Sequence, residues 1–262
     1  MTLWTNLGLT AALVLVLMLA AWAVGLRRGR HDGVDVVWGA GFALVAVATL
    51  AVSTGDLWVR LLVTAATVAW GGRLAWHIHR RNRGKPEDRR YVALLARATG
   101  SPALYALRRV YLVQGVLMWV VSLPVQFAQY GTGGAWWPVA LGAVLWAVGF
   151  AFESIGDAQL ARFTADPANQ GRVMDRGLWR YTRHPNYFGD ACVWWGLFLM
   201  ACHHWLGLAT VVSPLIMTFL LTRVSGAALL EKGMASTRQG YADYVARTSG
   251  FLPLPPKKGT VR

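Results

Sequence analysis

The segment Gly177–Asp190 holds the residues whose types and spacing best suit chemistry. It joins two arginines, Arg180 and Arg183, to the sequence His-Pro-Asn-Tyr. Pro185 favours the first position of a new helix, because its missing N–H would have no partner there in any case. Asn186 then offers its side chain at the positive end of that helix. Arginines beside a helix N-terminus are suited to bind an anion, such as the phosphates of a nucleotide.

Carboxylates near this segment need partners. Asp157 and Asp190 lie beside apolar residues, where a charge is costly unless it is paired. Anchoring at a membrane surface would explain the arginines and Tyr181, but it explains neither aspartate. Tyr187 offers a further side chain at the helix end. The chain has no G-x-G-x-x-G between a strand and a helix and no Walker A sequence, so a nucleotide would be held by arginines and backbone donors.

Metal ligands and disulfides are not expected. No Cys/His spacing typical of a metal site occurs in the sequence. Cys192 and Cys202 are the two cysteines. Ten residues of helix would separate them by about 15 Å. That separation is too great for a disulfide.

The elements that position these residues are predicted to be membrane helices. The 262 residues are 55% hydrophobic and 15% charged, and the mean hydropathy is +0.39. Soluble chains usually carry about a quarter charged residues. We therefore expect an all-α, polytopic helical bundle in a lipid bilayer, formed as one domain over residues 1–262. The apolar runs predict about seven spans: Leu3–Leu26, Val34–Ser53, Leu57–His77, Val110–Tyr130, Ala135–Phe152, Phe188–His203 and Trp205–Leu221.

Basic residues predict how the chain lies in the bilayer. The net charge is +14, and Lys and Arg collect in every second connection. The alternate loops Thr54–Asp56, Gly131–Gly134 and Cys202–His204 hold none. Because short cytoplasmic loops collect Lys and Arg, we expect a multi-pass protein of the cell membrane with its N-terminus outside and its C-terminus in the cytoplasm. This topology explains the charge, so we expect no nucleic-acid partner.

Three polar segments then share the cytoplasmic face, so one site can draw on all of them. They are the loops 77–109 and 157–187 and the tail 231–253.

At this point the sequence resembles the steroid 5-alpha-reductase superfamily, in particular its largely uncharacterised bacterial branch. The segment Gly177–Asp190 looks like that superfamily's signature. Similar stretches are Asp35–Gly39, the run from Arg73 to Tyr91, and the closing segment Tyr241–Pro253. The resemblance implies a seven-helix membrane fold that binds NADPH on the cytoplasmic side. It implies reduction of a carbon–carbon double bond conjugated to a carbonyl, in a hydrophobic small-molecule substrate.

The resemblance also suggests roles for residues. Asn186 and Asp157 match family residues that hold the cofactor. Gly189 and Asp190 match a Gly-Glu pair of the family, so the acidic side chain is shorter in this chain. His77 matches the tyrosine that faces the substrate carbonyl, and Tyr91 is the next candidate proton donor. The candidate cofactor-binding residues are Asp157, Arg172, Arg180, Tyr181, Arg183, Asn186, Tyr187, Asp190, Glu231, Tyr241 and Tyr244.

Departures from the family and simpler interpretations stay open. The glutamate that pairs with the family tyrosine has no clear match, and Asp35 is the nearest acid in the second span. Glu153 replaces another cofactor-binding asparagine. His77 also fits a plain interfacial histidine, Glu231 also fits the end of a helix, and the tail tyrosines also fit membrane anchors. Acids near Tyr91 also fit a surface ion-pair network.

Two other functions compete with a reductase. A membrane S-adenosylmethionine-dependent methyltransferase of the isoprenylcysteine or phospholipid type also carries Arg-His-Pro-x-Tyr-x-Gly before a late helix. A later glutamate and a Gly-x-x-Tyr-like tail follow in those enzymes. A non-enzymatic membrane scaffold or lipid-binding protein is the third hypothesis. Asp157, the asparagine within His-Pro-Asn-Tyr and the long first cytoplasmic loop favour the reductase.

Overall fold

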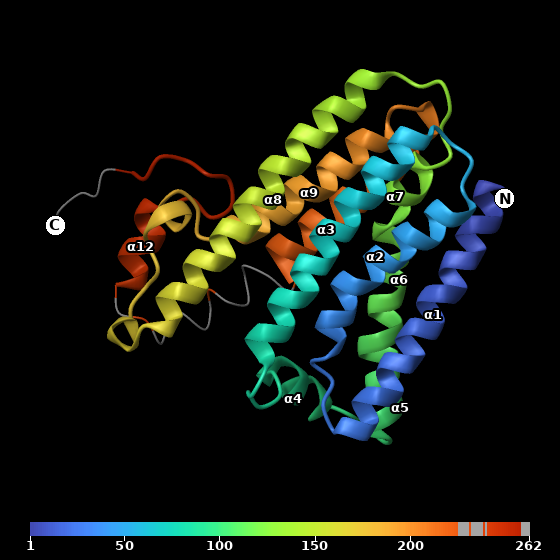
Figure 1. Cartoon of the computed structure of the whole chain (residues 1–262). Helices are drawn as coiled ribbons and strands as arrows, with labels where there is room; N and C mark the ends of the chain where they lie inside the picture. Colours follow the sequence, from blue (N-terminus) through green and yellow to red (C-terminus); the bar gives the residue numbers. More distant parts are fainter. Residues whose placement is uncertain (225–230, 232–237, 239, 258–262) are drawn as a thin grey trace. The chain divides into compact units, whose positions relative to one another are not determined.

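The computed structural model of the chain is helical, and it describes residues 1–224, 231, 238 and 240–257. No strand occurs among these residues, and a single bridge pairs Thr182 with Ser249. The chain divides into two compact units (Figure 1). Unit 1 contains Met1–Val139 and Met200–Ser213, and unit 2 contains Ala140–Leu199 and Pro214–Arg262.

The helices of unit 1 follow the chain in order. They are α1 (Leu3–Arg28), α2 (Val34–Val52), α3 (Leu57–Asn82), α4 (Arg89–Leu95), α5 (Pro102–Ala106), the π-helical turn η1 (Leu107–Tyr111), α6 (Leu112–Val121), α7 (Leu123–Ala128) and the 3-10 helix η4 (Trp205–Val211).

Unit 2 contains the other helices of the described residues. They are α8 (Trp136–Ala165), η2 (Pro167–Asn169), η3 (Gly177–Arg180), α9 (Pro185–Ala201), α10 (Val212–Phe219, whose first two residues lie in unit 1), η5 (Leu220–Val224) and α12 (Tyr241–Arg247). Of these, α8 begins in unit 1, and the last two residues of α9 lie in unit 1.

Local sequence signals set several helix ends. The hydroxyl of Thr2 accepts a hydrogen bond from the Thr5 N–H at 3.2 Å and caps the start of α1. Gly29 ends α1 with φ of 63°, a left-handed conformation that glycine adopts without a steric penalty. Pro185 is the first residue of α9, as the sequence predicts.

Close glycine contacts bring helices together inside each unit. In unit 1, a side chain at Gly39 of α2 would collide with the Gly71 carbonyl of α3. In unit 2, a side chain at Gly149 of α8 would meet the Gly189 carbonyl of α9 at 2.5 Å. One at Gly196 would meet Gly142 in the same way. Small residues that let backbones approach are typical of helix packing in membranes.

Unit 1 also encloses a polar network. Gln126 of α7 accepts hydrogen bonds from the Asn6 side-chain amide at 3.1 Å and from the Thr10 hydroxyl at 2.7 Å. It donates to the Ser122 hydroxyl at 2.9 Å. All four side chains are completely buried. The network joins α1 to the α6–α7 region, where a polar group gains most from an internal partner.

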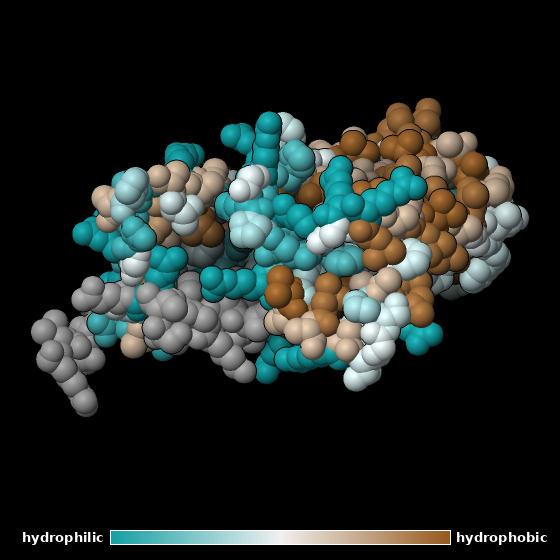
Figure 2. All heavy atoms as spheres, turned by 90° about the horizontal axis from the view of Figure 1, so that it is seen from below, coloured by the Kyte–Doolittle hydropathy of each residue, from teal (hydrophilic) through white to brown (hydrophobic). Residues whose placement is uncertain are grey.

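The apolar helices indicate a membrane protein, as predicted. Within the described part of the chain, five helical segments are long and apolar enough to cross a membrane: Leu3–Arg28, Val34–Val52, Pro102–Ala128, Trp136–Ala165 and Trp205–Val224. Exposed apolar side chains line them, and Figure 2 shows a broad hydrophobic (brown) surface. The other two predicted spans are also helical: α3 contains several arginines, and α9 has only 17 residues. The count of seven spans stays a prediction.

Several helix boundaries differ from the sequence prediction, and two of the differences concern candidate site residues. The third span was expected to end at His77, but α3 continues to Asn82, so His77 lies inside the helix. The fifth was expected to end at Phe152, but α8 continues to Ala165 and includes Asp157. Polar residues with good helix propensity carry each helix past the end of its apolar run.

Candidate functional site

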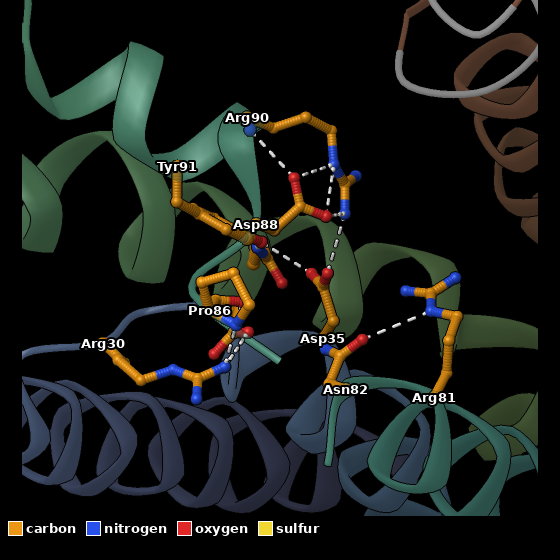
Figure 3. A network of polar contacts seen from close by, with 10 residues as sticks. Arg30, Asp35, Arg81, Asn82, Pro86, Asp88, Arg90 and Tyr91 are labelled. Carbon is orange, nitrogen blue, oxygen red and sulfur yellow. Dashed lines mark hydrogen bonds and ion pairs between the residues drawn. The ribbon is translucent and has the colours of Figure 1, made fainter. Parts of the chain in front are cut away.

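Unit 1 contains a buried acid–tyrosine pair (Figure 3). Asp35, in the first turn of α2, accepts a hydrogen bond of 2.6 Å from the hydroxyl of Tyr91 on α4. Tyr91 is 7% exposed, and its hydroxyl also accepts a 3.3 Å hydrogen bond from the Gln114 side chain. Three segments of the chain thus converge on one phenol.

Arg90 forms ion pairs with two acids of the same cluster. Its guanidinium contacts Asp35 at 3.0 Å and Asp88 at 2.9 Å. Asp88 also caps α4 by accepting from the Arg90 N–H at 2.8 Å. Burial would raise the pKa of Asp88, but the hydrogen bonds from Arg90 lower that pKa below its ordinary value. The predicted surface ion-pair network therefore exists between Asp88 and Arg90, and it also reaches into α2.

Electrostatics keep the proton on Tyr91. Burial raises the pKa of Tyr91 far above its ordinary value, and the charge and hydrogen bond of Asp35 raise it further. The phenol is thus a neutral hydrogen-bond donor throughout the physiological pH range.

The α1–α2 connection is joined to the α3–α4 connection by further polar contacts. The Glu87 carboxylate accepts from the His31 N–H. The His31 ring lies 2.9 Å from the hydroxyl of the buried Tyr111. Arg30 forms an ion pair with Asp32 at 2.7 Å. These contacts fix the connection on which Asp35 begins.

His77 lies on α3 in unit 1, where its side chain is half-buried. His77 has an interaction partner within the protein. Its predicted catalytic role stays a prediction.

In unit 2 two residues that the resemblance assigns to the cofactor, Asn186 and Asp157, are hydrogen-bonded to each other. The Asn186 amide, in the first turn of α9, donates to the Asp157 carboxylate of α8 at 3.1 Å. Its carbonyl oxygen accepts from the Tyr187 N–H at 3.0 Å. Asp157 is 8% exposed, so the hydrogen bond gives this buried carboxylate a partner. One amide N–H of Asn186 and further acceptor capacity remain for a ligand.

A second cluster in unit 2 joins Arg183 and His184 to Glu231. The Arg183 guanidinium contacts the Glu231 carboxylate at 2.9 Å and 3.3 Å. His184 is 2% exposed and lies 2.9 Å from the same carboxylate. Burial lowers the pKa of His184 although Glu231 opposes this shift. Burial would raise the pKa of Glu231, but hydrogen bonds from Arg183 and His184 lower it.

The same region holds the tail in place. Arg183 donates to the Thr248 carbonyl at 2.9 Å, and the Thr182 hydroxyl donates to the Phe251 carbonyl at 2.8 Å. The Tyr244 hydroxyl donates to the Trp179 carbonyl at 2.6 Å. Arg183 and Tyr244, both predicted to bind cofactor, thus have structural contacts within unit 2. Residues 232–237 and 239 of the predicted tail segment lie outside the described residues.

The remaining predicted residues differ in exposure. Arg172, Arg180 and Tyr181 are exposed, whereas Asp190 is buried on α9. Tyr241 is 4% exposed, and its hydroxyl has no hydrogen-bond partner among the described residues. The exposed arginines suit phosphate groups, and a buried hydroxyl without a partner suits a polar ligand atom.

Sequence reasoning missed two of these relationships. It did not select His184, although a histidine directly before a helix-starting proline is held at a fixed point of the chain. It named Asp35 only as the nearest acid, and Gln114 not at all. Nothing in local spacing indicates that Asp35 and Tyr91, 56 residues apart, would pair.

Comparison with known proteins gives one match. The family model described as "Protein of unknown function (DUF1295)" matches residues 21–248, which include both clusters. Neither a curated protein nor a solved structure matches the chain.

Proposed function

Because the chain belongs to the DUF1295 family, whose function is unknown, we propose its reaction from its residues. We propose an NADPH-dependent membrane reductase of a carbon–carbon double bond conjugated to a carbonyl in a lipid-like substrate. The resemblance of the segment Gly177–Asp190 to the steroid 5-alpha-reductase superfamily supports this reaction. We also propose that the chain has the fold of that superfamily, with seven membrane spans and a cytoplasmic C-terminus.

The observation that carries the proposal is the Asn186–Asp157 pair. The resemblance assigns both residues to the cofactor, and they are hydrogen-bonded at the start of a helix. Within unit 2, Asn186 would bind a polar group of NADPH, and the exposed Arg172 and Arg180 would bind its phosphates. Arginine favours a 2′-phosphate, so NADPH is preferred over NADH.

Tyr91 and His77 are the candidate hydrogen-bond donors for the carbonyl oxygen of the substrate. NADPH, when bound, would supply a hydride for the β carbon, and a proton from water would complete the reduction at the α carbon. A neutral phenol suits the charge that develops on an enolate oxygen. To act there, Tyr91 would have to turn its one proton from Asp35 to that oxygen. Asp35 positions the phenol, and His77 is the alternative donor.

The methyltransferase remains the second candidate, and one observation favours it. His184 of the Arg-His-Pro sequence is bonded to the later Glu231. Those are two of the features that the S-adenosylmethionine-dependent enzymes share. Ligand preference separates the two functions.

The test is a titration of the purified full-length protein in detergent with NADPH, NADH and S-adenosylmethionine, followed by thermal shift. We expect NADPH to stabilise the protein more than NADH or S-adenosylmethionine does. Stabilisation by S-adenosylmethionine alone would replace the reductase with the methyltransferase. NADPH oxidation is then measured against a panel of enones and enoyl lipids.

Matched variants separate binding from folding. Asn186→Ala should lose NADPH binding, whereas Gln170→Ala, an exposed amide in the same unit, should not. Arg180→Gln should weaken NADPH binding at an unchanged melting temperature, because its side chain is exposed. Arg183→Gln should lower the melting temperature by itself, because it breaks the contacts to Glu231 and the tail. Equal NADPH affinity in Asn186→Ala and the parent protein would contradict the assignment.

A further inference from the structure

A pocket of about 380 Å³ lies within unit 1 where α1 ends and α2 and α3 approach the same connection. None of the proposed catalytic residues lines it. Its polar lining comes from Arg28, Arg30, Asp32, His79, Asn82 and Arg83. The lining also includes the first turn of α2, whose N-terminus has no side-chain cap.

The charge of this lining is positive. Arg30 is paired with Asp32 at 2.7 Å, so these two side chains neutralise each other. Within the described part of the chain, the side chains of Arg28 and Arg83 form no hydrogen bond or ion pair. Two cations without an ion-pair partner among the described residues therefore line one cavity. Together they favour an anion.

The opposite lining is apolar. Ala21 and Val24 of α1 and Val36 and Val37 of α2 contribute to it. Val24 is 46% exposed, so the pocket adjoins the outer apolar surface of α1. Both helices belong to the segments able to cross a membrane, and the pocket lies at their ends. Lipid headgroups lie at that depth. Figure 2 shows hydrophilic and hydrophobic surface meeting on the molecule.

We propose that this pocket binds the phosphate headgroup of an anionic phospholipid, with the phosphate between Arg28 and Arg83 and the acyl region along Val24. A free phosphate or a nucleotide carries the same anionic phosphoryl group as the lipid headgroup. The apolar wall on the lipid-facing side favours the lipid, because a free anion gains nothing from it. The site is separate from the acid–tyrosine pair, so it does not depend on the proposed reaction.

The experiment measures apparent Kd values for the purified full-length protein in detergent. The probes are short-chain phosphatidylglycerol, short-chain phosphatidylcholine and inorganic phosphate, each titrated by thermal shift. We expect phosphatidylglycerol to bind more tightly than either of the other two. The double variant Arg28→Gln/Arg83→Gln should weaken it about 30-fold, from two basic contacts.

The matched control is Arg27→Gln/Arg89→Gln, which removes the same charge from exposed positions outside the pocket. Its affinity should equal that of the parent protein. Gly33→Leu adds volume at the pocket lining while it keeps both arginines, and the Cβ atom of the new side chain has no atom within 4 Å. Gly33→Leu should lose phosphatidylglycerol binding at an unchanged melting temperature. If the double arginine variant fails to fold, Gly33→Leu alone tests the proposal.

Several outcomes would overturn the proposal. Equal affinity for phosphatidylcholine would show that charge is not recognised. Equal affinity for inorganic phosphate would leave an anion site without a lipid. Equal weakening in both double variants would point to the net charge of the protein, and unchanged binding in Gly33→Leu would remove the ligand from this pocket.

Discussion

Tyr91 keeps its phenolic proton because burial and the neighbouring Asp35 carboxylate both raise its pKa. A neutral phenol at a fixed position can donate to a developing oxyanion without any change of protonation beforehand. An imidazole, unlike a phenol, usually changes its protonation between about pH 5 and 8, so the pH dependence of the rate would distinguish a histidine donor from a tyrosine donor. The two candidate donors therefore predict different kinetics as well as different mutants.

The first prediction follows from this difference. Tyr91→Phe should lower kcat by about 10²–10⁴-fold, the usual contribution of a positioned proton or hydrogen-bond donor. NADPH affinity should stay unchanged, because cofactor binding is assigned to other residues. The measurement is enone-dependent NADPH oxidation beside a nucleotide titration. Tyr105→Phe is the control, because Tyr105 is a half-buried tyrosine of the same unit whose hydroxyl forms no hydrogen bond with the described residues. Full activity in Tyr91→Phe, with activity lost in His77→Ala, would transfer the role to His77.

The His184–Glu231 contact predicts how the tail responds to acid. Burial lowers the pKa of His184, so the folded protein binds fewer protons there than the unfolded chain does. Stability from this site is therefore complete above about pH 6.5 and falls as the pH drops below it. The lowered pKa of Glu231 adds a further loss at more acidic pH.

The second prediction is that hydrogen exchange of the α12 amides accelerates as the pH falls from 7 towards 5.5, after correction for the intrinsic exchange rate. His184→Gln should flatten this dependence within that window. His204→Gln lies in the other unit and should leave it unchanged. The same pH profile in His184→Gln as in the parent protein would show that another group controls the tail.

At the scale of elements, the α8–α9 contact depends on glycine. A side chain at Gly149 would lie 2.5 Å from the Gly189 carbonyl and 2.7 Å from the Val193 nitrogen, both backbone atoms. Backbone cannot move aside as a flexible side chain would, so the helices would have to separate. Asn186 and Asp157 lie on the same two helices, and their pairing depends on this approach.

The third prediction is that Gly149→Ala destabilises the protein by about 1–3 kcal/mol, the usual cost of overpacking. Gly8→Ala is the matched control, because a side chain there meets nothing within 4 Å. It should be neutral, or slightly stabilising because alanine favours a helix over glycine. Both are measured as shifts in denaturation midpoint. A neutral Gly149→Ala would mean that α8 and α9 pack less closely than the structure describes.

For the whole molecule, periodicity and composition could predict helices but not their partners. Apolar runs predicted a helix at each of the seven places, and Pro185 predicted the start of α9. Helix ends were harder, because polar residues such as those after His77 and Phe152 continue a helix beyond its apolar run. Contacts between distant residues were hardest. The pairing of Asp35 with Tyr91 depends on tertiary packing, and no local pattern encodes it.

Topology remains the largest property that sequence predicts and that labelling can test. With seven spans, the connections after α3 and after α8 share one side, and the connection after α7 lies on the other. An N-terminus in the cytoplasm would place these three connections on the opposite sides. The orientation of the chain can therefore be read from side-specific labelling of exposed residues. Thr99, Thr132 and Ala168 are exposed positions in the three connections.

The fourth prediction uses single cysteines at these positions in a variant without Cys192 and Cys202. The connections that contain Thr99 and Ala168 are rich in arginine, and the one that contains Thr132 has no Lys or Arg. Because basic short loops remain in the cytoplasm, a membrane-impermeant maleimide should label Thr132→Cys in intact cells. It should label Thr99→Cys and Ala168→Cys only after lysis. The reverse pattern would fit seven spans in the opposite orientation, with the N-terminus in the cytoplasm. That outcome would place the Asp35–Tyr91 pair and the Gly177–Asp190 segment outside the cytoplasm, where NADPH is not supplied, and the reductase would have to be abandoned.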